Sequence, residues 1–382
     1  MQFMTRRKAL RKLMGTAVVA GLGASTSLGA QAAGGPRLRL IGHTSLPHKL
    51  QFQNTTVGGL SGLDYNREKG IYYALSDDRS DHGPARFYTL KLPITVDTLG
   101  APELLAVTTL QTPDGKPYPS RKTVEAGGEV PDPESIRLCV ATNTLYWTSE
   151  GDAARGKPPF IREMRLDGSY ASQMALPAMF AFDPDKKTGV CDNLALEGLA
   201  FSPSGDTVWA AMEGPLLQDG PPPSVGSPGG PIRFTQFAAQ SGQPIRQIAY
   251  MADAIPKGPL IPGMAADNGV SEIWMASEEG MLVLERSYAT GVGNSIRLYW
   301  IDTEDAGDVI AIPKLETGKF KPAAKVLLLD FASVGLPRLD NTEGMTRGPT
   351  LQNGNPTLVF VSDDNFNSSQ VTQFVAFEWL AA

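Results

Sequence analysis

The chain of 382 residues is poor in histidine and cysteine. It has three histidines, His43, His48 and His82, and two cysteines, Cys139 and Cys191. So few imidazole and thiolate groups exclude a histidine-rich transition-metal site and disfavour zinc chemistry. We expect the two cysteines to lie at different depths of their sheets, although a folded-back loop would bring them within the roughly 7 Å between Cα atoms that a disulfide needs. The pairing is left open.

The short motifs of several enzyme classes are also missing. There is no Gly-x-Ser-x-Gly nucleophile elbow, no Walker loop and no dinucleotide-binding fingerprint. Ser61, in Gly59-Leu60-Ser61-Gly62, lacks the elbow spacing, which disfavours a conventional serine esterase. After the N-terminus no apolar run is long enough to cross a bilayer, so we expect no membrane insertion.

The N-terminus has the organisation of an export signal. Basic residues within 5–12 precede a mildly apolar stretch, 13–24, and the small-x-small sequence Ala30-Gln31-Ala32. The paired arginines favour a twin-arginine signal over residues 1–32, with an ordinary secretory signal as the alternative. Both interpretations predict a periplasmic or secreted protein in which residues 36–382 form one domain.

The charge balance is acidic, with a formal net charge of −6. Loss of residues 1–32, with their five lysines and arginines, would change it to −11. Such a surface argues against nucleic-acid or anionic-membrane partners and favours cations.

The most informative feature that is present is a repeated acidic hairpin. Residues 196–214 read as a strand, a Ser-Pro-Ser-Gly-Asp turn and a returning strand. Glu197 opens this hairpin and Glu213 closes it, sixteen positions later. Because the strands are antiparallel, both carboxylates should lie at the same edge.

The same pattern occurs at four other places. The remaining pairs run from Ser61 to Asp77, from Glu134 to Glu150, from Glu272 to Glu285 and from Glu343 to Asp363. The five starting positions are separated by 73, 63, 75 and 71 residues. Self-similarity at a nearly constant period indicates a repeat architecture.

Further predicted strands follow each hairpin. They span residues 86–92, 103–107, 160–166, 170–176, 232–237, 246–251, 296–301, 326–331 and 371–379. The last unit has three strands, and the separate strand at 37–42 can supply its fourth. We therefore predict an all-β chain, a β-propeller of five four-stranded blades closed by the N-terminal strand. Six blades, and an open two-sheet β-sandwich, are the alternatives.

In a propeller the hairpin ends would gather at one mouth of the central channel. Two carboxylates 4 Å apart repel by about 4 kcal/mol at an effective dielectric constant of 20. Bound cations, arginines or protonation can compensate this repulsion. Oxygen ligands without histidine or cysteine suit Ca²⁺, and then Mg²⁺. The predicted metal ligands are Asp77, Asp78, Glu134, Glu150, Glu197, Glu213, Glu272, Glu285, Glu343 and Asp363.

Two alternatives to a cation site stay open. The glutamates on the first strands would also serve as caps that accept hydrogen bonds from backbone N–H groups of neighbouring blades. Four arginines flank the same edges and would form ion pairs there: Arg79, Arg137, Arg286 and Arg347.

Several of these segments resemble a known family. Gly59-Leu60-Ser61-Gly62-Leu63-Asp64, Leu75-Ser76-Asp77-Asp78-Arg79, Glu197-Gly198-Leu199-Ala200, Val283-Leu284-Glu285-Arg286 and Asn341-Thr342-Glu343-Gly344-Met345 resemble the phytase-like family, described as "esterase-like activity of phytase". The resemblance covers about residues 38–379. It implies an exported bacterial β-propeller, related to phytases that hydrolyse phytate with Ca²⁺ ions held by channel carboxylates.

The first functional hypothesis is a Ca²⁺-dependent phosphoester hydrolase. Glu197, Glu213, Arg286 and His82 are its candidate catalytic residues, although a loop histidine such as His82 is often merely solvated. The second hypothesis is a metal-dependent lactonase or carboxylesterase, and the third is a non-catalytic periplasmic binding propeller. For both enzymes we expect a monomer acting on a small-molecule ester or phosphoester.

Overall fold

The computed structural model describes residues 37–125 and 127–380. Within these ranges the helical segments are short 3-10 turns: η3 (Ala153–Arg155), η4 (Ala178–Phe180) and η5 (Phe331–Ser333). No helix of this part of the chain is long and apolar enough to cross a membrane. The predicted export segment, 1–32, lies outside the described residues.

The described strands form five four-stranded antiparallel sheets and one two-stranded ribbon, β2 (Gln51–Phe52) with β3 (Thr55–Thr56). Each sheet follows chain order from its inner strand outward, apart from the closing strand of blade 5. Blade 1 contains β4 (Leu60–Asn66), β5 (Ile71–Ser76), β6 (Arg86–Lys91) and β7 (Glu103–Thr109); blade 2 contains β8 (Pro133–Cys139), β9 (Thr144–Ser149), β10 (Phe160–Met164) and β11 (Tyr170–Gln173); blade 3 contains β12 (Leu196–Phe201), β13 (Thr207–Met212), β14 (Ile232–Ala238) and β15 (Pro244–Tyr250); blade 4 contains β16 (Ala266–Met275), β17 (Gly280–Ala289), β18 (Gly293–Asp302) and β19 (Lys325–Asp330); blade 5 contains β20 (Asn341–Thr350), β21 (Pro356–Asp363), β22 (Gln373–Leu380) and β1 (Arg37–Ser45).

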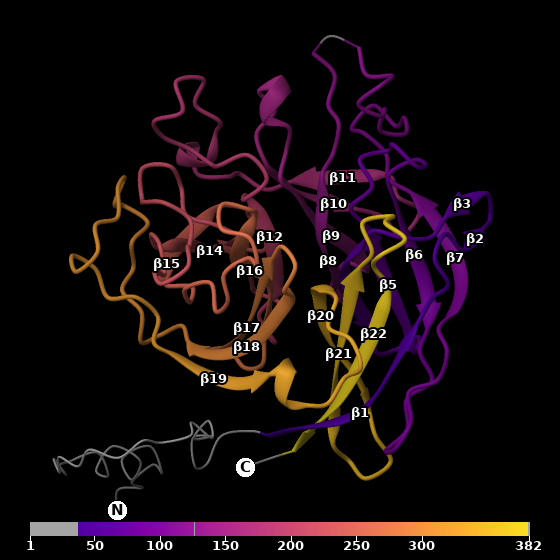
Figure 1. Cartoon of the computed structure of the whole chain (residues 1–382). Helices are drawn as coiled ribbons and strands as arrows, with labels where there is room; N and C mark the ends of the chain where they lie inside the picture. Colours follow the sequence, from indigo (N-terminus) through magenta and orange to yellow (C-terminus); the bar gives the residue numbers. More distant parts are fainter. Residues whose placement is uncertain (1–36, 126, 381–382) are drawn as a thin grey trace, which may run out of the picture. The chain divides into compact units, whose positions relative to one another are not determined.

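The ring is closed by strands from the two ends of the described chain. β1 pairs antiparallel with β22, with Leu38 opposite Trp379 and Leu40 opposite Phe377. Figure 1 shows the indigo β1 alongside the yellow β22. The predicted five-bladed propeller with an N-terminal closing strand is therefore confirmed, in place of the six-bladed and sandwich alternatives.

The inner strands contact one another in sequence around the channel: β4 with β8, β8 with β12, β12 with β16, β16 with β20, and β20 with β4. Each inner strand has a β-bulge, near its start in four blades and in the middle of β16, where one or two residues leave the regular pairing. The bulged residues are Ser61, Glu134 with Ser135, Glu197, Ser271 and Glu343. A bulge re-aims a side chain, and here it turns three glutamates toward the channel mouth.

Glycines allow these strands to approach closely. A Cβ at Gly62 would lie 2.6 Å from the carbonyl oxygen of Glu134, and one at Gly344 would lie 2.8 Å from the carbonyl oxygen of Ser61. Both obstacles are backbone atoms of the adjacent blade. A larger residue would therefore force neighbouring blades apart.

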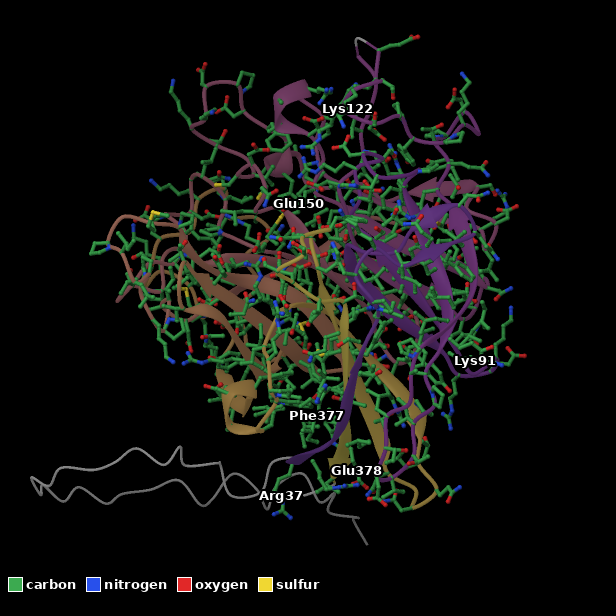
Figure 2. All side chains as sticks on the ribbon, turned by 45° about the vertical axis from the view of Figure 1, so that its right-hand side comes forward. Arg37, Lys91, Lys122, Glu150, Phe377 and Glu378 are labelled. Atoms are coloured by element: carbon green, nitrogen blue, oxygen red, sulfur yellow. The ribbon has the colours of Figure 1, made fainter. Side chains whose placement is uncertain are left out.

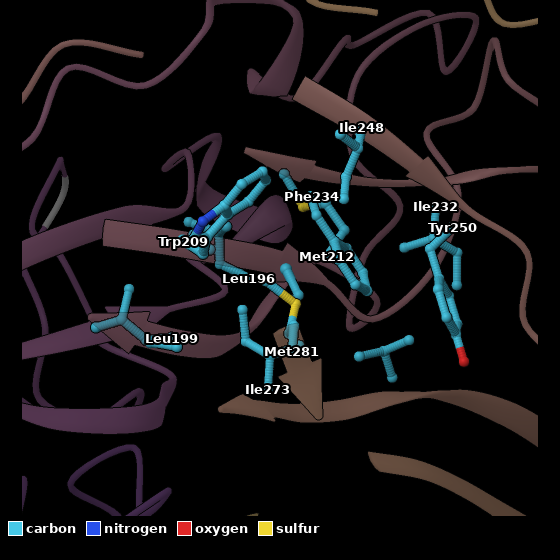
Figure 3. Packing of buried hydrophobic residues seen from close by; sticks show 14 of the residues in the cluster. Leu196, Leu199, Trp209, Met212, Ile232, Phe234, Ile248, Tyr250, Ile273 and Met281 are labelled. Carbon is cyan, nitrogen blue, oxygen red and sulfur yellow. The ribbon is translucent and has the colours of Figure 1, made fainter. Parts of the chain in front are cut away.

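The hydrophobic core lies between adjacent sheets. Figure 3 shows Leu196, Trp209 and Phe234 of blade 3 near Ile273 and Met281 of blade 4. Trp209 is 1% exposed. Loss of a buried aromatic side chain of this size typically costs about 3–5 kcal/mol. The packed faces fix the positions of the inner strands and therefore of the channel residues.

Candidate functional site at the acidic channel mouth

The second strand of each blade delivers one charged residue to the mouth of the channel. In blade 3, for example, Leu196 lies just before the bulge and pairs with Met212, and the charged residue Glu213 follows Met212. The same register holds in all five blades. These equivalent residues are Asp77, Glu150, Glu213, Arg286 and Asp363. Four carboxylates and one guanidinium group thus form a ring.

The ring and the bulged glutamates enclose a cavity of about 900 Å³, which we call the acidic basin. Its inner wall includes Asp77, Glu134, Glu150, Glu197, Arg286, Glu343 and Asp363. Glu150 is buried, and Figure 2 shows it in the upper half of the view, whereas Arg37 and Glu378 lie near the bottom.

Two groups of three carboxylates in the basin are compact enough to hold a metal ion. One consists of Asp132, Glu134 and Glu150, and the other of Glu150, Glu197 and Glu213. Within each group, one oxygen from every residue lies within 4.8 Å of the others. Glu150 belongs to both groups, which we call the Glu150 triads. Their all-oxygen donor set fits Ca²⁺ or Mg²⁺.

Burial strongly perturbs these carboxyl groups. Desolvation, followed by the charges of neighbouring carboxylates, raises the pKa of Glu134 and Glu197 well above the usual value. Desolvation and the charge of Glu213 raise the pKa of Glu150 to about 8. Burial also raises the pKa of Glu213 to about 7, against the opposing effect of Arg286. The basin therefore favours bound protons or bound cations over bare negative charges.

Part of the repulsion is relieved by Arg286. Its Nη2 donates a hydrogen bond to Oε1 of Glu213 at 3.1 Å and lies 3.7 Å from Oε1 of Glu343. Its Nη1 donates to Oδ1 of Asp267 at 2.8 Å. Among the described residues, no hydrogen-bond donor or cationic group contacts the side chains of Asp77, Glu134 and Glu197. These three are therefore the carboxylates most available to an added cation.

The rim of the basin carries three more arginines, each already paired with a carboxylate. Arg79 binds Asp132, Arg121 binds Asp81, and Arg338 binds Asp340. His82 also lies at the rim, where its ring stacks on Phe366 with 4.2 Å between the centroids.

Two predicted ligands, Asp78 and Glu285, have other partners. Asp78 accepts a hydrogen bond from Nη1 of Arg86 at 2.7 Å and others from the backbone of Asp81 and His82. Glu285 faces away from the basin, where it accepts hydrogen bonds from Tyr250 and Lys325, both at 2.6 Å. Their carboxylates are thus committed to interactions within the protein.

Glu272 lies deeper in the channel. Its Oε2 is 2.7 Å from Nη2 of Arg137, and its Oε1 accepts a hydrogen bond from the backbone N–H of Leu199. Arg137 in turn donates to carbonyl oxygens of blades 1, 2, 4 and 5: Leu63, Ile136, Ile273 and Met345. The pair therefore touches the inner strands of all five blades, and we call it the channel plug.

The misplacement of Glu272 and Glu285 has one cause. In blade 4 the bulged residue is Ser271, so the residues equivalent to Glu197 and Glu213 are Ser271 and Arg286. A pairing that starts from Glu272 is displaced by one position. A shift of one residue moves a side chain to a different face of a strand.

Sequence reasoning missed Asp132 and Asp267. Asp132 belongs to a Glu150 triad, and Asp267 holds Arg286. Each lies shortly before a bulge, outside the hairpin-end pattern, although Asp132-Pro133-Glu134 was a local signal of a second acid. Both cysteines, Cys139 and Cys191, are free.

Comparison with known proteins gives one family. Residues 55–366 match the phytase-like family, described as esterase-like activity of phytase. No curated protein sequence matches the chain.

Several solved structures are similar at low sequence identity. An endo-arabinase from Bacteroides thetaiotaomicron is 10% identical, over 84% of this chain and 93% of that chain, with a TM-score of 0.45. A catalytic domain of an α-L-arabinofuranosidase from Coprinopsis cinerea is 10% identical, over 90% and 97%, with a TM-score of 0.42. A gluconolactonase from Xanthomonas campestris is 12% identical, over 91% and 96%, with a TM-score of 0.35.

Proposed function

Because the chain belongs to the phytase-like family, we propose that its acidic basin is the active site of an exported, Ca²⁺-dependent phosphoester hydrolase. The observation that carries the proposal is the pair of Glu150 triads. Two overlapping sets of buried oxygen ligands favour adjacent hard cations over a single isolated one.

The residues fit such ions chemically. Within the triads, the carboxylates of Glu134 and Glu197 have no hydrogen-bond or ion-pair partner among the described residues, and Glu150 would be shared. When bound, Ca²⁺ ions would neutralise the carboxylates, bind phosphate oxygens and acidify water. The basin volume of about 900 Å³ is large enough for a small-molecule ester.

Glu213 of the second triad and two other side chains of the basin, Arg286 and His82, have further roles in this proposal. Glu213, whose pKa is raised to about 7, is suited to accept the proton of an attacking water near neutral pH. Arg286, held between Glu213 and Glu343, would stabilise charge that develops on the phosphoryl group. His82 at the rim is the second candidate for proton transfer, to or from the leaving alcohol.

The test is hydrolysis of phytate and p-nitrophenyl phosphate by the purified protein, with Ca²⁺ and with EDTA. We expect phosphate release that depends on Ca²⁺ and falls at least 100-fold in the Glu197→Gln/Glu213→Gln variant. Glu68→Gln is the control, because Glu68 is exposed and makes no hydrogen bond or ion pair with the described residues. Equal background rates in wild type and the double variant would overturn the proposal.

A second candidate is a metal-dependent lactonase or carboxylesterase acting in the same basin. One observation favours it: the rim arginines Arg79, Arg121 and Arg338 are all paired with carboxylates. An uncharged ester needs no free cationic side chains. A panel of lactones and carboxylic esters with added Ca²⁺, Mg²⁺ or Mn²⁺ distinguishes the two enzymes. Inactivity on both panels, together with no Ca²⁺ binding, would favour the non-catalytic binding propeller.

A further inference from the structure

A second cavity lies at the other end of the channel, beyond the plug. It measures about 180 Å³ and we call it the lower cavity. Asp64, Trp274 and Thr346 in its wall directly follow the residues whose carbonyl oxygens accept hydrogen bonds from Arg137. Tyr65, Arg67, Arg347, Gly348 and Thr350 complete the wall.

The charge of the lower cavity is opposite to that of the basin. Arg67 and Arg347 line it together, and neither forms an ion pair with the described residues. Desolvation and the nearby charge of Arg67 lower the pKa of Arg347. Asp64 is the one acidic residue in the wall, and its oxygens accept hydrogen bonds from the backbone N–H of Leu138 and from Oγ1 of Thr346. Both arginines are exposed residues at the opening of the cavity, and neither guanidinium group has an ion-pair partner among the described residues.

A buried hydroxyl group without a partner lies next to the same cavity. Tyr72 is 1% exposed, and its hydroxyl has no hydrogen-bond partner among the described residues. A Cβ placed on Gly348, a residue of the wall, would lie 2.7 Å from this hydroxyl. A buried donor that lacks an acceptor costs about 1–3 kcal/mol.

We propose that the lower cavity is a binding site for a small organic anion, whose phosphate or carboxylate group binds Arg67 and Arg347. The planar guanidinium group matches both of these oxyanions. Trp274 offers an indole surface for an apolar or ring-shaped part of the ligand. The cavity has about one fifth of the basin volume, so this ligand is smaller than the substrate that the basin admits.

Isothermal titration calorimetry tests the proposal on protein that has been treated with EDTA and then dialysed into metal-free buffer without EDTA. Removal of cations leaves the basin repulsive to anions, and removal of EDTA keeps its own carboxylates from competing for the site. The probes are inorganic phosphate, phenyl phosphate and benzoate; the two aromatic probes separate phosphate from carboxylate recognition. We expect one site, binding weakened at least 10-fold by Arg67→Ala or Arg347→Ala, and lost in the double variant. Trp274→Ala should weaken the aromatic probes more than inorganic phosphate.

Arg165→Ala is the matched control. Arg165 is an exposed arginine after β10 that does not line the lower cavity, so its loss makes the same change in net charge. Its binding should equal that of wild type, and thermal melts should show that every variant is folded. Absence of binding by all three probes, or unchanged affinity in the double arginine variant, would overturn the proposal. The result is independent of the basin chemistry, because these variants leave the Glu150 triads intact.

Discussion

Glu150 is the residue on which both candidate cation sites depend. It contributes to both triads, its pKa is raised to about 8, and the backbone N–H of Ala195 donates a hydrogen bond to it. Its negative charge is costly without a cation and useful with one. Stability and cation binding therefore make opposite demands on this side chain.

The Glu150→Gln variant separates these demands. In EDTA at pH 8 we expect the variant to be more stable than wild type by on the order of 1–2 kcal/mol, because one repelling charge is removed. With Ca²⁺ the order should reverse, since both triads lose their shared ligand. Thermal melts with and without Ca²⁺, and Glu68→Gln as control, measure both effects. A Ca²⁺-induced rise in melting temperature equal to that of wild type would argue against the triads as ligands.

Arg286 illustrates how one substitution within a repeat changes a site. It occupies the position that is a carboxylate in the other four blades: Asp77, Glu150, Glu213 and Asp363. A fifth carboxylate would add repulsion, whereas a guanidinium group joins Glu213 to Glu343. The sequence already singled out Arg286, but as a neighbour of Glu285. It did not show that Arg286, and not Glu285, holds the fifth position of the ring.

At the scale of the element, the hairpin pattern predicted most of the architecture. The five hairpins, the outer strands and the closing pair β1–β22 follow from alternation, turn residues and period. The bulge of blade 4 could not be predicted, because the spacing of acidic residues in the sequence does not show which residue falls outside the regular strand pairing. Asp132 and Asp267 were missed for a related reason: they lie in or near connections whose path depends on tertiary contacts.

The channel plug, formed by Arg137 and Glu272, connects the inner strands of all five blades. Glu272 occupies the position that is glycine in β4, β12 and β20, namely Gly62, Gly198 and Gly344. The inner strands approach closely elsewhere, so this side chain is directed into the channel to meet Arg137. The partners satisfy one another's charge in a site where Arg137 is only 2% exposed and Glu272 fully buried.

Removal of one partner should be costly and removal of both much less so. We expect Glu272→Leu to destabilise the protein by about 3–5 kcal/mol, because Arg137 is left as a buried uncompensated charge. The Arg137→Met/Glu272→Leu variant should regain much of that loss. Urea denaturation of the two single variants and the double variant gives the coupling energy. Additive effects would contradict a direct interaction between the two side chains.

At the scale of the whole molecule, the acidic basin makes stability depend on pH. Burial raises the pKa of Glu150 and Glu343 to about 8, and that of Glu213 and Asp363 to about 7. In the unfolded chain these groups lose their protons near the ordinary pKa values of 4.5 for glutamate and 3.8 for aspartate. The folded state therefore holds more protons between about pH 4 and pH 8, and its stability falls as pH rises through this window.

Calcium should reverse this trend. Ca²⁺ binds the ionised carboxylates, so the stabilisation it provides should be larger at pH 8 than at pH 5. Thermal melts at pH 5, 6, 7 and 8, in EDTA and in Ca²⁺, test both slopes. We expect the melting temperature to decline with pH in EDTA, and the difference between the two series to widen. A melting temperature in EDTA that rises steadily across this range would contradict the assignment of the basin carboxyl groups as destabilising when charged.

The β1–β22 pair also has a consequence for biosynthesis. A ribosome makes β1 more than 300 residues before its partner strand β22. Until then the growing polypeptide exposes an unsatisfied strand edge, a surface on which other chains can add. Nascent-chain truncations that end before residue 373 should accordingly be vulnerable to self-association, since the molecule can close its ring of blades only after β22 has been made.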